Sequence, residues 1–300
     1  YEIVIVSDGS TDGTDERIPD RVTDEIRFVT QENGGPAVAR NTGIAASTGE
    51  LLVFIDDDVV PEPGCVRTHV EAHDAADGRL VVIGPLLTPT SVELSPYVTW
   101  EQRMLYKQYD AMAEGRYGAT ARQFYTGNAS MPRSLLEEFG GFDAAFRRAE
   151  DVELGYRLGA AGVPFAFQPD AEAYHFAERS FESWIDIAAS YGRNDVIFWR
   201  DGGQSWLVPR VRAEFRSRHL LNRWFTRLGV RVPAVGRLVE RVTKTVVERD
   251  GGADSALGQR LLSAVYNLRY YSALVDELGG PAEFRKISPL RDASDPRWRR

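Results

Sequence analysis

Residues 50–61 read ELLVFIDDDVVP, an apolar run that ends in three consecutive aspartates and is closed by a proline. Val, Ile and Phe favour a buried strand, and a short apolar run of this kind is typical of the central strand of a parallel sheet. Carboxylates crowded at one strand end repel one another unless a cation or hydrogen-bond donors lie between them. Because ligands bind at the carboxyl ends of strands in open α/β sheets, Asp56, Asp57 and Asp58 predict a divalent-metal site. A solvated acidic turn explains the triplet equally well at this point.

The size and composition of the chain describe a large globular protein. Its 300 residues, 43% of them hydrophobic, can form one large domain or one domain with an appendage. The single cysteine, Cys65, excludes an internal disulfide and fits a reducing compartment. No apolar run approaches the roughly 18 to 20 residues that a membrane helix needs, and no basic-then-apolar signal segment opens the chain. We therefore expect a cytoplasmic location.

The net charge of −8 is unevenly distributed. Residues 205–300 contain 19 basic and 10 acidic side chains, whereas the remainder contains 17 and 34. An acidic body with a basic C-terminal region suggests separate partners for the two parts. Nucleic acid is not expected, because no finger, RNP or basic-aromatic motif accompanies the charge. Peripheral contact with an anionic membrane on its inner face, through residues 210–231, fits the charge, and so does an ordinary basic helical surface.

The segment before the aspartates alternates expected strands and loops. Residues 2–6 read EIVIV, a buried strand that runs into the turn-forming loop SDGSTDGT at 7–14. Residues 31–49 begin with a glycine-rich turn and continue as a helix, whose N-terminal N–H groups can face an anion. Arg40 lies one turn into that helix and can reach a phosphate, although a helix-packing arginine fits the same position. This order of elements predicts an α/β fold with a parallel sheet.

A second acidic motif lies at residues 150–151. Residues 152–161 are expected to form a helix, which places Glu150 and Asp151 at its N-terminus, where the helix dipole favours carboxylates. A pair of helix-capping acids is the alternative. Nearby are the segments FYTGNASMPR at 124–133 and GGFD at 140–143, and the strand-like run that ends at His175.

Taken in order, these segments resemble the family 2 inverting glycosyltransferases with the GT-A fold. The matching pieces are SDGSTDGT at 7–14, the GI to GE segment at 43–50, Asp56-Asp57-Asp58 as the DxD motif, GGFD at 140–143, and Glu150-Asp151 as the catalytic acid motif. The resemblance covers roughly residues 1–176. It implies an α/β, Rossmann-like, mostly parallel sheet, here followed by a helical C-terminal extension.

The resemblance also implies roles for individual residues. The donor set comprises Asp8 at the nucleotide base and Asp57 near the ribose or sugar diphosphate, with Gly9, Ser10, Arg40 and Asp56. Asp58, with Asp56 and His175, would hold Mn²⁺ or Mg²⁺ on the diphosphate. Asp151 would be the general base, with Glu150 beside it, and the acceptor side would comprise Gly127, Asn128, Gly141 and Phe142.

The implied reaction transfers a sugar from a nucleoside-diphosphate donor to a hydroxyl of a glycan, polysaccharide or lipid-linked saccharide, as in cell-envelope polysaccharide synthesis. A hard cation with oxygen ligands stabilises the leaving diphosphate, and an inverting displacement needs one base on the acceptor hydroxyl. A nucleotidyltransferase and a non-catalytic carbohydrate-binding domain of the same fold are the alternatives.

The expected domains are a GT-A catalytic domain at 1–180 and a helical region at 181–300. Family members begin with a further strand and helix before the segment that matches residues 1–6. We expect that this first strand and helix are missing upstream and that the sequence starts inside a longer protein. We also expect the chain as given to bind nucleotide sugar weakly.

Overall fold

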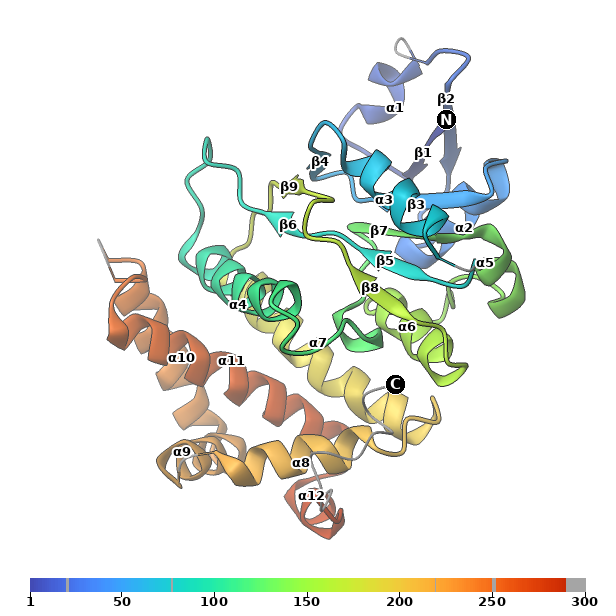
Figure 1. Ribbon diagram of the computed structural model, residues 1–300. Coiled ribbons are helices and arrows are strands. Elements are labelled where there is room, and N and C mark those ends of the chain that lie inside the picture. Colours follow the sequence, from blue (N-terminus) through green and yellow to red (C-terminus); the bar gives the residue numbers. More distant parts are fainter. Residues whose placement is uncertain (20–21, 77, 219, 250–251, 290–300) are drawn as a thin grey trace. The chain divides into compact units, whose positions relative to one another are not determined.

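The computed structural model describes residues 1–19, 22–76, 78–218, 220–249 and 252–289. The first part of the chain alternates short strands and helices (Figure 1). These elements are β1 (Ile3–Asp8), α1 (Thr14–Arg17), β2 (Ile26–Gln31), α2 (Pro36–Ala46), β3 (Leu51–Ile55), β4 (Val59–Pro61), α3 (Cys65–Asp74), β5 (Val81–Ile83), β6 (Leu86–Leu87), α4 (Pro96–Ala113), η2 (Ala121–Gln123), β7 (Asn128–Pro132), α5 (Arg133–Phe139), α6 (Glu150–Ala160), β8 (Phe165–Phe167) and β9 (Ala173–His175).

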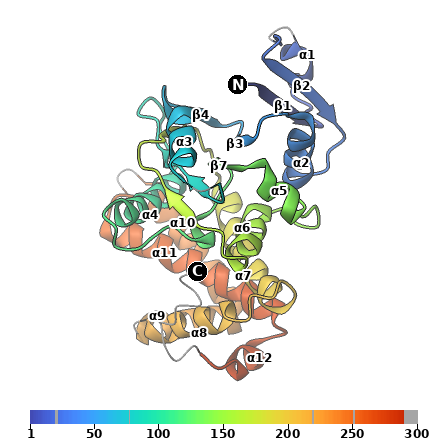
Figure 2. The ribbon, with the colours of Figure 1, turned by 45° about the vertical axis from the view of Figure 1, so that its right-hand side comes forward.

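The strands pair in three groups. β1 and β2 are parallel, with α2 packed beside β1 (Figures 1 and 2). A four-stranded sheet has the order β3-β7-β5-β8, and a three-stranded sheet the order β4-β9-β6. In these sheets β3–β7, β5–β7 and β4–β9 are antiparallel, whereas β5–β8 and β6–β9 are parallel.

The expected α/β fold class is confirmed, but the strand pairing is mixed rather than mostly parallel. β3, the apolar run expected at the centre of a parallel sheet, pairs only with β7 among the described strands, and the two run antiparallel. An apolar run favours burial, although the residues of β3 are only half-buried. Such a run does not determine the direction of a partner strand that follows some 70 residues later.

β7 shows how the core of this part is built. Ala129 and Met131 are fully buried against the hydrophobic residues of α5 and α6. Asn128 and Ser130 face the other side, where they bond to His69 of α3. Since successive side chains of a strand point to opposite faces, α3 covers one face of β7 and α5 with α6 the other.

The second part of the chain is helical. It contains α7 (Phe181–Arg200), α8 (Leu207–Ser217), α9 (Leu220–Arg231), α10 (Pro233–Val247), α11 (Ala256–Glu277) and α12 (Pro281–Lys286). Ser180 and Ser255 cap α7 and α11 by accepting hydrogen bonds from Ser183 N and Gly258 N. A Cβ at Gly192 would lie 2.2 Å from the Tyr270 carbonyl oxygen, so α7 and α11 pack in direct backbone contact. No helix of the described residues is long and apolar enough to cross a membrane.

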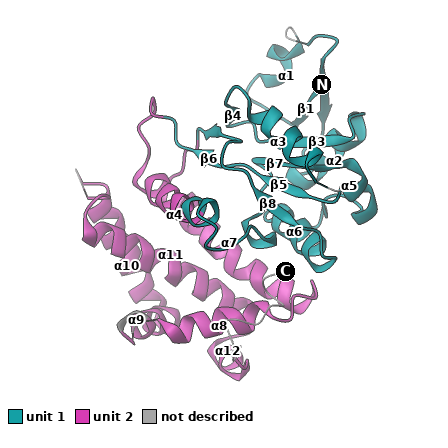
Figure 3. Ribbon diagram, in the orientation of Figure 1, with its two compact units in different colours: residues 1–89, 109–176, 300 teal, residues 90–108, 177–299 magenta. Residues whose placement is uncertain are grey.

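The chain divides into two compact units (Figure 3). The first comprises residues 1–89 and 109–176, and the second comprises residues 90–108 and the described part of 177–299. Compared with the expected boundary at residue 180, the main difference is the assignment of residues 90–108 to the helical unit. The reason is aromatic packing, since Tyr97 stacks on Trp184 of α7 and Trp100 packs edge-on against the same ring. Residues 290–300 of the expected C-terminal region lie outside the described residues.

Candidate active site

The aspartate triplet forms the turn between β3 and β4. The register that pairs Ile55 with Asn128 places Asp56 at the end of β3, and Val59 N donates to the Asp56 carbonyl at 3.1 Å to close the turn. β4 then pairs with β9, which sets Val59 opposite His175. His175 Nε2 consequently lies 3.1 Å from Asp58 Oδ2, whereas Asp57 is exposed in the turn.

Arg40 of α2 connects the triplet to the second acidic motif. Its guanidinium donates to Asp56 Oδ1 at 2.8 Å and to Glu150 Oε1, and it lies over the Phe142 ring. The side chains of Arg40 and Glu150 are only 18% and 7% exposed. Burial alone would lower the pKa of Arg40, but the two carboxylates raise it above its usual value. The expected phosphate contact of Arg40 remains a prediction, because in this structure its charge is balanced by carboxylates.

Asp151 is the second residue of α6 and lies beside this ion pair. Ala149, the N-cap residue, has φ 61° and is the only non-glycine residue with positive φ among those described. Asp151 Oδ1 accepts a hydrogen bond from Val152 N at 2.7 Å. Burial and the charge of Glu150 raise the pKa of Asp151 to about 6, although the Val152 N–H and Arg40 act in the opposite direction. A carboxylate with this pKa is a better proton acceptor near neutral pH than an ordinary aspartate.

Asp8 holds the glycine-rich turn that precedes α2. Its carboxylate accepts hydrogen bonds from the N–H groups of Gly34 and Gly35, both at 2.8 Å, and from Gln31 Nε2 at 2.7 Å. Burial would raise the pKa of Asp8, but these hydrogen bonds lower it below its usual value. The N–H groups at the start of this helix were expected to face an anion, and those of Gly34 and Gly35, which directly precede α2, bind the Asp8 carboxylate. Gly9 (φ 73°) and Ser10, which bonds to Ser7, form the turn after Asp8.

The four expected acceptor-side residues are buried. Gly127 borders the triplet, since a Cβ there would lie 3.1 Å from Asp56 Oδ2. Asn128 is fully buried and its amide nitrogen donates to the carbonyls of Pro85 and Ala171, so its side chain faces no substrate in this structure. Gly141 and Phe142 form a turn that Asn41 of α2 holds by hydrogen bonds to both backbone groups of Phe142. Phe142 is 2% exposed and packs edge-on against Phe54.

The side chains at the start of β4 and the end of β9 are suitable ligands for a divalent cation. Asp58 and His175 present a carboxylate oxygen and an imidazole nitrogen to one point, and both are accepted ligands of Mn²⁺. Within the described residues no group of three or more such side chains is gathered, so phosphate oxygens and water would complete the coordination. Asp56, the third expected ligand, is paired with Arg40 instead.

A buried hydrogen-bonded chain supports the strand end that presents the triplet, and the sequence analysis missed it. His69 and His73 of α3 both bond to Ser130 Oγ at 2.8 Å, and His69 Nε2 bonds to Asn128 Oδ1 at 2.9 Å. Because Asn128 Oδ1 can only accept, His69 donates a hydrogen bond to it from Nε2. His69 Nδ1 then accepts a hydrogen bond from the Ser130 hydroxyl, whose oxygen accepts one from His73 Nε2. Burial lowers the pKa of both histidines, which keeps them neutral. The four-residue spacing of His69 and His73, which places them on one face of a helix, was the one available signal in the sequence.

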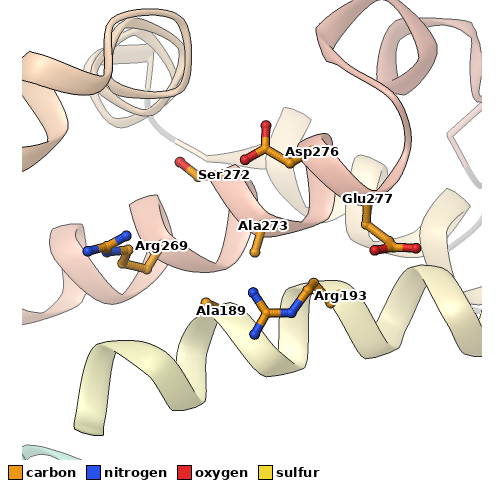
Figure 4. Close-up of a pocket in the computed structure, with 7 residues that line it drawn as sticks. All are labelled: Ala189, Arg193, Arg269, Ser272, Ala273, Asp276 and Glu277. Carbon is orange, nitrogen blue, oxygen red and sulfur yellow. The ribbon is translucent and has the colours of Figure 1, made fainter. Parts of the chain in front are cut away.

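The helical unit contains a groove that none of the residues described above lines. Side chains of α7 and α11 line it, and its volume is about 340 Å³ (Figure 4). Arg193 and Arg269 are offset by Asp276 and Glu277, so the lining has no excess of either charge. None of the expected site residues lies in this groove.

The fold is similar to that of a solved glycosyltransferase. A mannosyltransferase from Pyrobaculum calidifontis, solved in complex with GDP-Man and Mn²⁺, superposes with a TM-score of 0.56 at 20% identity, covering 90% of this chain and 78% of that one. Residues 1–140 match the sequence model of glycosyl transferase family 2. Residues 1–140 are therefore similar to glycosyl transferase family 2, the family that the sequence motifs resemble.

Curated relatives agree with that assignment. Validoxylamine A glucosyltransferase from Streptomyces hygroscopicus subsp. jinggangensis is 32% identical over 214 residues, which cover 61% of this chain and 50% of that protein. Pre-mycofactocin glycosyltransferase from Mycobacterium tuberculosis is 29% identical over 161 residues, which cover 53% of this chain and 33% of that protein. The chain thus spans half or less of the length of these relatives.

Proposed function

We propose that the chain acts as a metal-dependent inverting glycosyltransferase, with Asp151 as the general base. The observation that carries the proposal is the environment of Asp151, whose pKa is raised to about 6 at the start of α6. At neutral pH this carboxylate is ionised yet basic enough to take the proton of an acceptor hydroxyl. Glu150 acts on Asp151 through its charge and anchors Arg40, so it is a positioning residue.

The proposed donor is a nucleoside-diphosphate sugar. Asp58 and His175 would hold Mn²⁺ or Mg²⁺, and Asp57 lies exposed in the same turn, where it can contact the sugar or ribose. When bound, the cation would offset the negative charge of the leaving diphosphate. Asp8, at the start of the loop proposed to bind the nucleotide, holds the Gly34–Gly35 turn by hydrogen bonds. The proposed acceptor is a hydroxyl of a glycan, polysaccharide or lipid-linked saccharide.

The direct test is a panel of nucleotide sugars with Mn²⁺ and saccharide acceptors, with release of nucleoside diphosphate as the readout. Asp151→Asn should abolish transfer while donor affinity in calorimetry stays close to that of the unmodified protein. Asp170→Asn is the matched control, because Asp170 is exposed in the same unit and outside the site. Turnover by Asp151→Asn at the rate of the unmodified protein would reject the base assignment. A separate reaction with a nucleoside triphosphate and a sugar phosphate tests the alternative, because a nucleotidyltransferase would join them and release pyrophosphate.

The metal assignment has its own test. Mn²⁺ binding in the presence of nucleoside diphosphate is measured by calorimetry for the unmodified protein, Asp58→Ala and His175→Ala. Both variants should weaken metal-dependent nucleotide binding, whereas Asp74→Asn, an exposed aspartate at the end of α3, should not. Unchanged binding by Asp58→Ala would show that the cation is held elsewhere.

A further inference from the structure

The helical unit exposes large apolar side chains on two adjoining helices. Leu220 and Trp224 of α9 are 71% and 58% exposed, and Leu238 and Val242 of α10 are 58% and 45% exposed. Apolar side chains of this size are normally covered when they occur together. Their grouping on one helical hairpin therefore needs a physical explanation.

The spacing within each helix places these residues on one side. In α9, Leu220, Trp224, Arg227 and Arg231 follow the i, i+4, i+7, i+11 pattern of a single helix face. In α10, the same pattern joins Ala234, Leu238, Arg241 and Thr245, with Val242 next to it. The α9 face thus combines Leu220 and Trp224 with two arginines, and the α10 face combines Leu238 and Val242 with Arg241.

Both faces point away from the same buried helix. A Cβ at Gly229 of α9 would lie 2.6 Å from Leu268 of α11, and one at Gly236 of α10 would lie 3.6 Å from the same side chain. Gly229 and Gly236 therefore mark the inner sides of α9 and α10, and both helices pack on α11 (Figure 1). Because the exposed residues occupy the helix sides opposite these glycines, they form one outward surface, the α9–α10 face.

The charge of the hairpin identifies the partner. Residues 220–247 contain six basic side chains and one acidic side chain. The acidic one, Glu240, is bonded to Arg269 of α11, and its side chain is only 13% exposed. A second copy of the chain would bring equal positive faces together, which is unfavourable. Nucleic acid would satisfy the arginines but would leave the leucines and the valine without an apolar partner.

We propose that the α9–α10 face docks on the surface of an anionic membrane. Trp224, Leu220, Leu238 and Val242 would enter the boundary between headgroups and acyl chains, while Arg227, Arg231 and Arg241 contact lipid phosphates. Tryptophan is favoured at this depth of a bilayer. The attachment is peripheral, and it does not depend on the proposed glycosyl transfer.

The test uses the full chain and two vesicle compositions. Co-sedimentation is measured with phosphatidylcholine alone and with phosphatidylcholine containing phosphatidylglycerol, at low and high salt. We expect binding to the anionic vesicles only, weakened by salt. Arg231→Glu with Arg241→Glu should reduce the partition coefficient about tenfold or more, as should Trp224→Ala with Leu238→Ala. Arg67→Glu and Tyr117→Ala, exposed residues of the other unit, are the matched controls and should not change it.

A depth measurement separates insertion from electrostatic attraction alone. Bromine-labelled lipids should quench part of the tryptophan fluorescence of the bound protein, and Trp224→Phe should lose most of that quenching while still binding. Equal binding to both vesicle types, or no binding to either, would overturn the proposal. So would a monomer–dimer equilibrium in light scattering that Trp224→Ala with Leu238→Ala abolishes, because the face would then join two copies of the chain.

Discussion

Arg40 donates a hydrogen bond to the carboxylate of Glu150, a residue 110 positions later in the chain. The same guanidinium bonds to Asp56, so one side chain of α2 joins the end of β3 to the start of α6. The Glu150 carboxylate is thereby held close to Asp151, and its charge contributes to the raised pKa of Asp151. Arg40 therefore holds two segments together by hydrogen bonds, and the charges of this cluster change the pKa of Asp151, the proposed base.

Arg40→Met should be strongly destabilising. It leaves the buried Glu150 carboxylate without its partner, which typically costs about 3–5 kcal/mol of unfolding free energy. Arg40→Met combined with Glu150→Gln should recover part of this loss, because no buried charge is then left alone. Urea unfolding of the two single variants and the double variant gives the coupling, and strict additivity of the single changes would contradict it. Arg79→Met, which breaks an exposed pair with Glu138, is the control and should change little.

Glu150→Gln should move the acidic limb of the pH–activity profile. Asp151 must be deprotonated to accept a proton, so kcat/KM should fall as the pH drops through about 6. Removal of the Glu150 charge makes the Asp151 carboxylate easier to ionise, and the limb should move to lower pH. The measurement is kcat/KM between pH 4.5 and 8. Glu153→Gln, in the same helix but bonded to Arg157, should leave the limb in place.

Asp151→Asn should stabilise the fold at neutral pH. The folded-state pKa of about 6 lies above the usual 3.8, so the folded protein holds this proton more tightly than the unfolded chain, and its ionisation opposes folding. The stability of the unmodified protein should therefore decline as the pH rises from about 4 to 6. Asp151→Asn should escape this decline and gain up to about 3 kcal/mol at pH 7.5. A gain of the same size at pH 4 would rule out this explanation.

Ala149→Gly should be neutral or stabilising, by up to about 1 kcal/mol. Ala149 has a left-handed backbone conformation, which glycine adopts without a steric penalty. Ala149→Val should be destabilising, because a β-branched side chain tolerates that conformation poorly. Thermal unfolding of the two variants measures the difference, and the same melting temperature for both would contradict it.

Asn128→Ala should destabilise the first unit by about 2–4 kcal/mol. It leaves the His69 N–H and the Ala171 carbonyl buried without the partner that Asn128 supplies, and each costs about 1–3 kcal/mol when nothing replaces the bond. The Pro85 carbonyl also loses its bond from Asn128 but keeps the one from Ala173 N. Urea unfolding checks the value, with Thr245→Ala on the exposed side of α10 as a control. A loss of activity with unchanged stability would instead support a direct contact of Asn128 with the acceptor.

The sequence by itself determined the local elements and the family. An apolar run that ends in aspartates, a glycine-rich turn before a helix, and an acidic pair at a helix start are set by neighbouring residues, and their order along the chain identifies the class. Each is a property of short segments, so burial and backbone preference suffice to predict it. The helix containing His69 and His73 could be predicted in the same way.

The tertiary structure alone decided which of these residues meet. Strand register placed His175 beside Asp58. The packing of α2 and α6 placed the Arg40 guanidinium in contact with Glu150 and Asp56 rather than in an open site. Asp8 turned out to bind the N–H groups at the start of α2, and Asn128 to be buried under α3. Such contacts depend on the direction and register of strands that are distant in sequence. The raised pKa of Asp151 depends on them too, because burial and nearby charge exist only after the chain has folded.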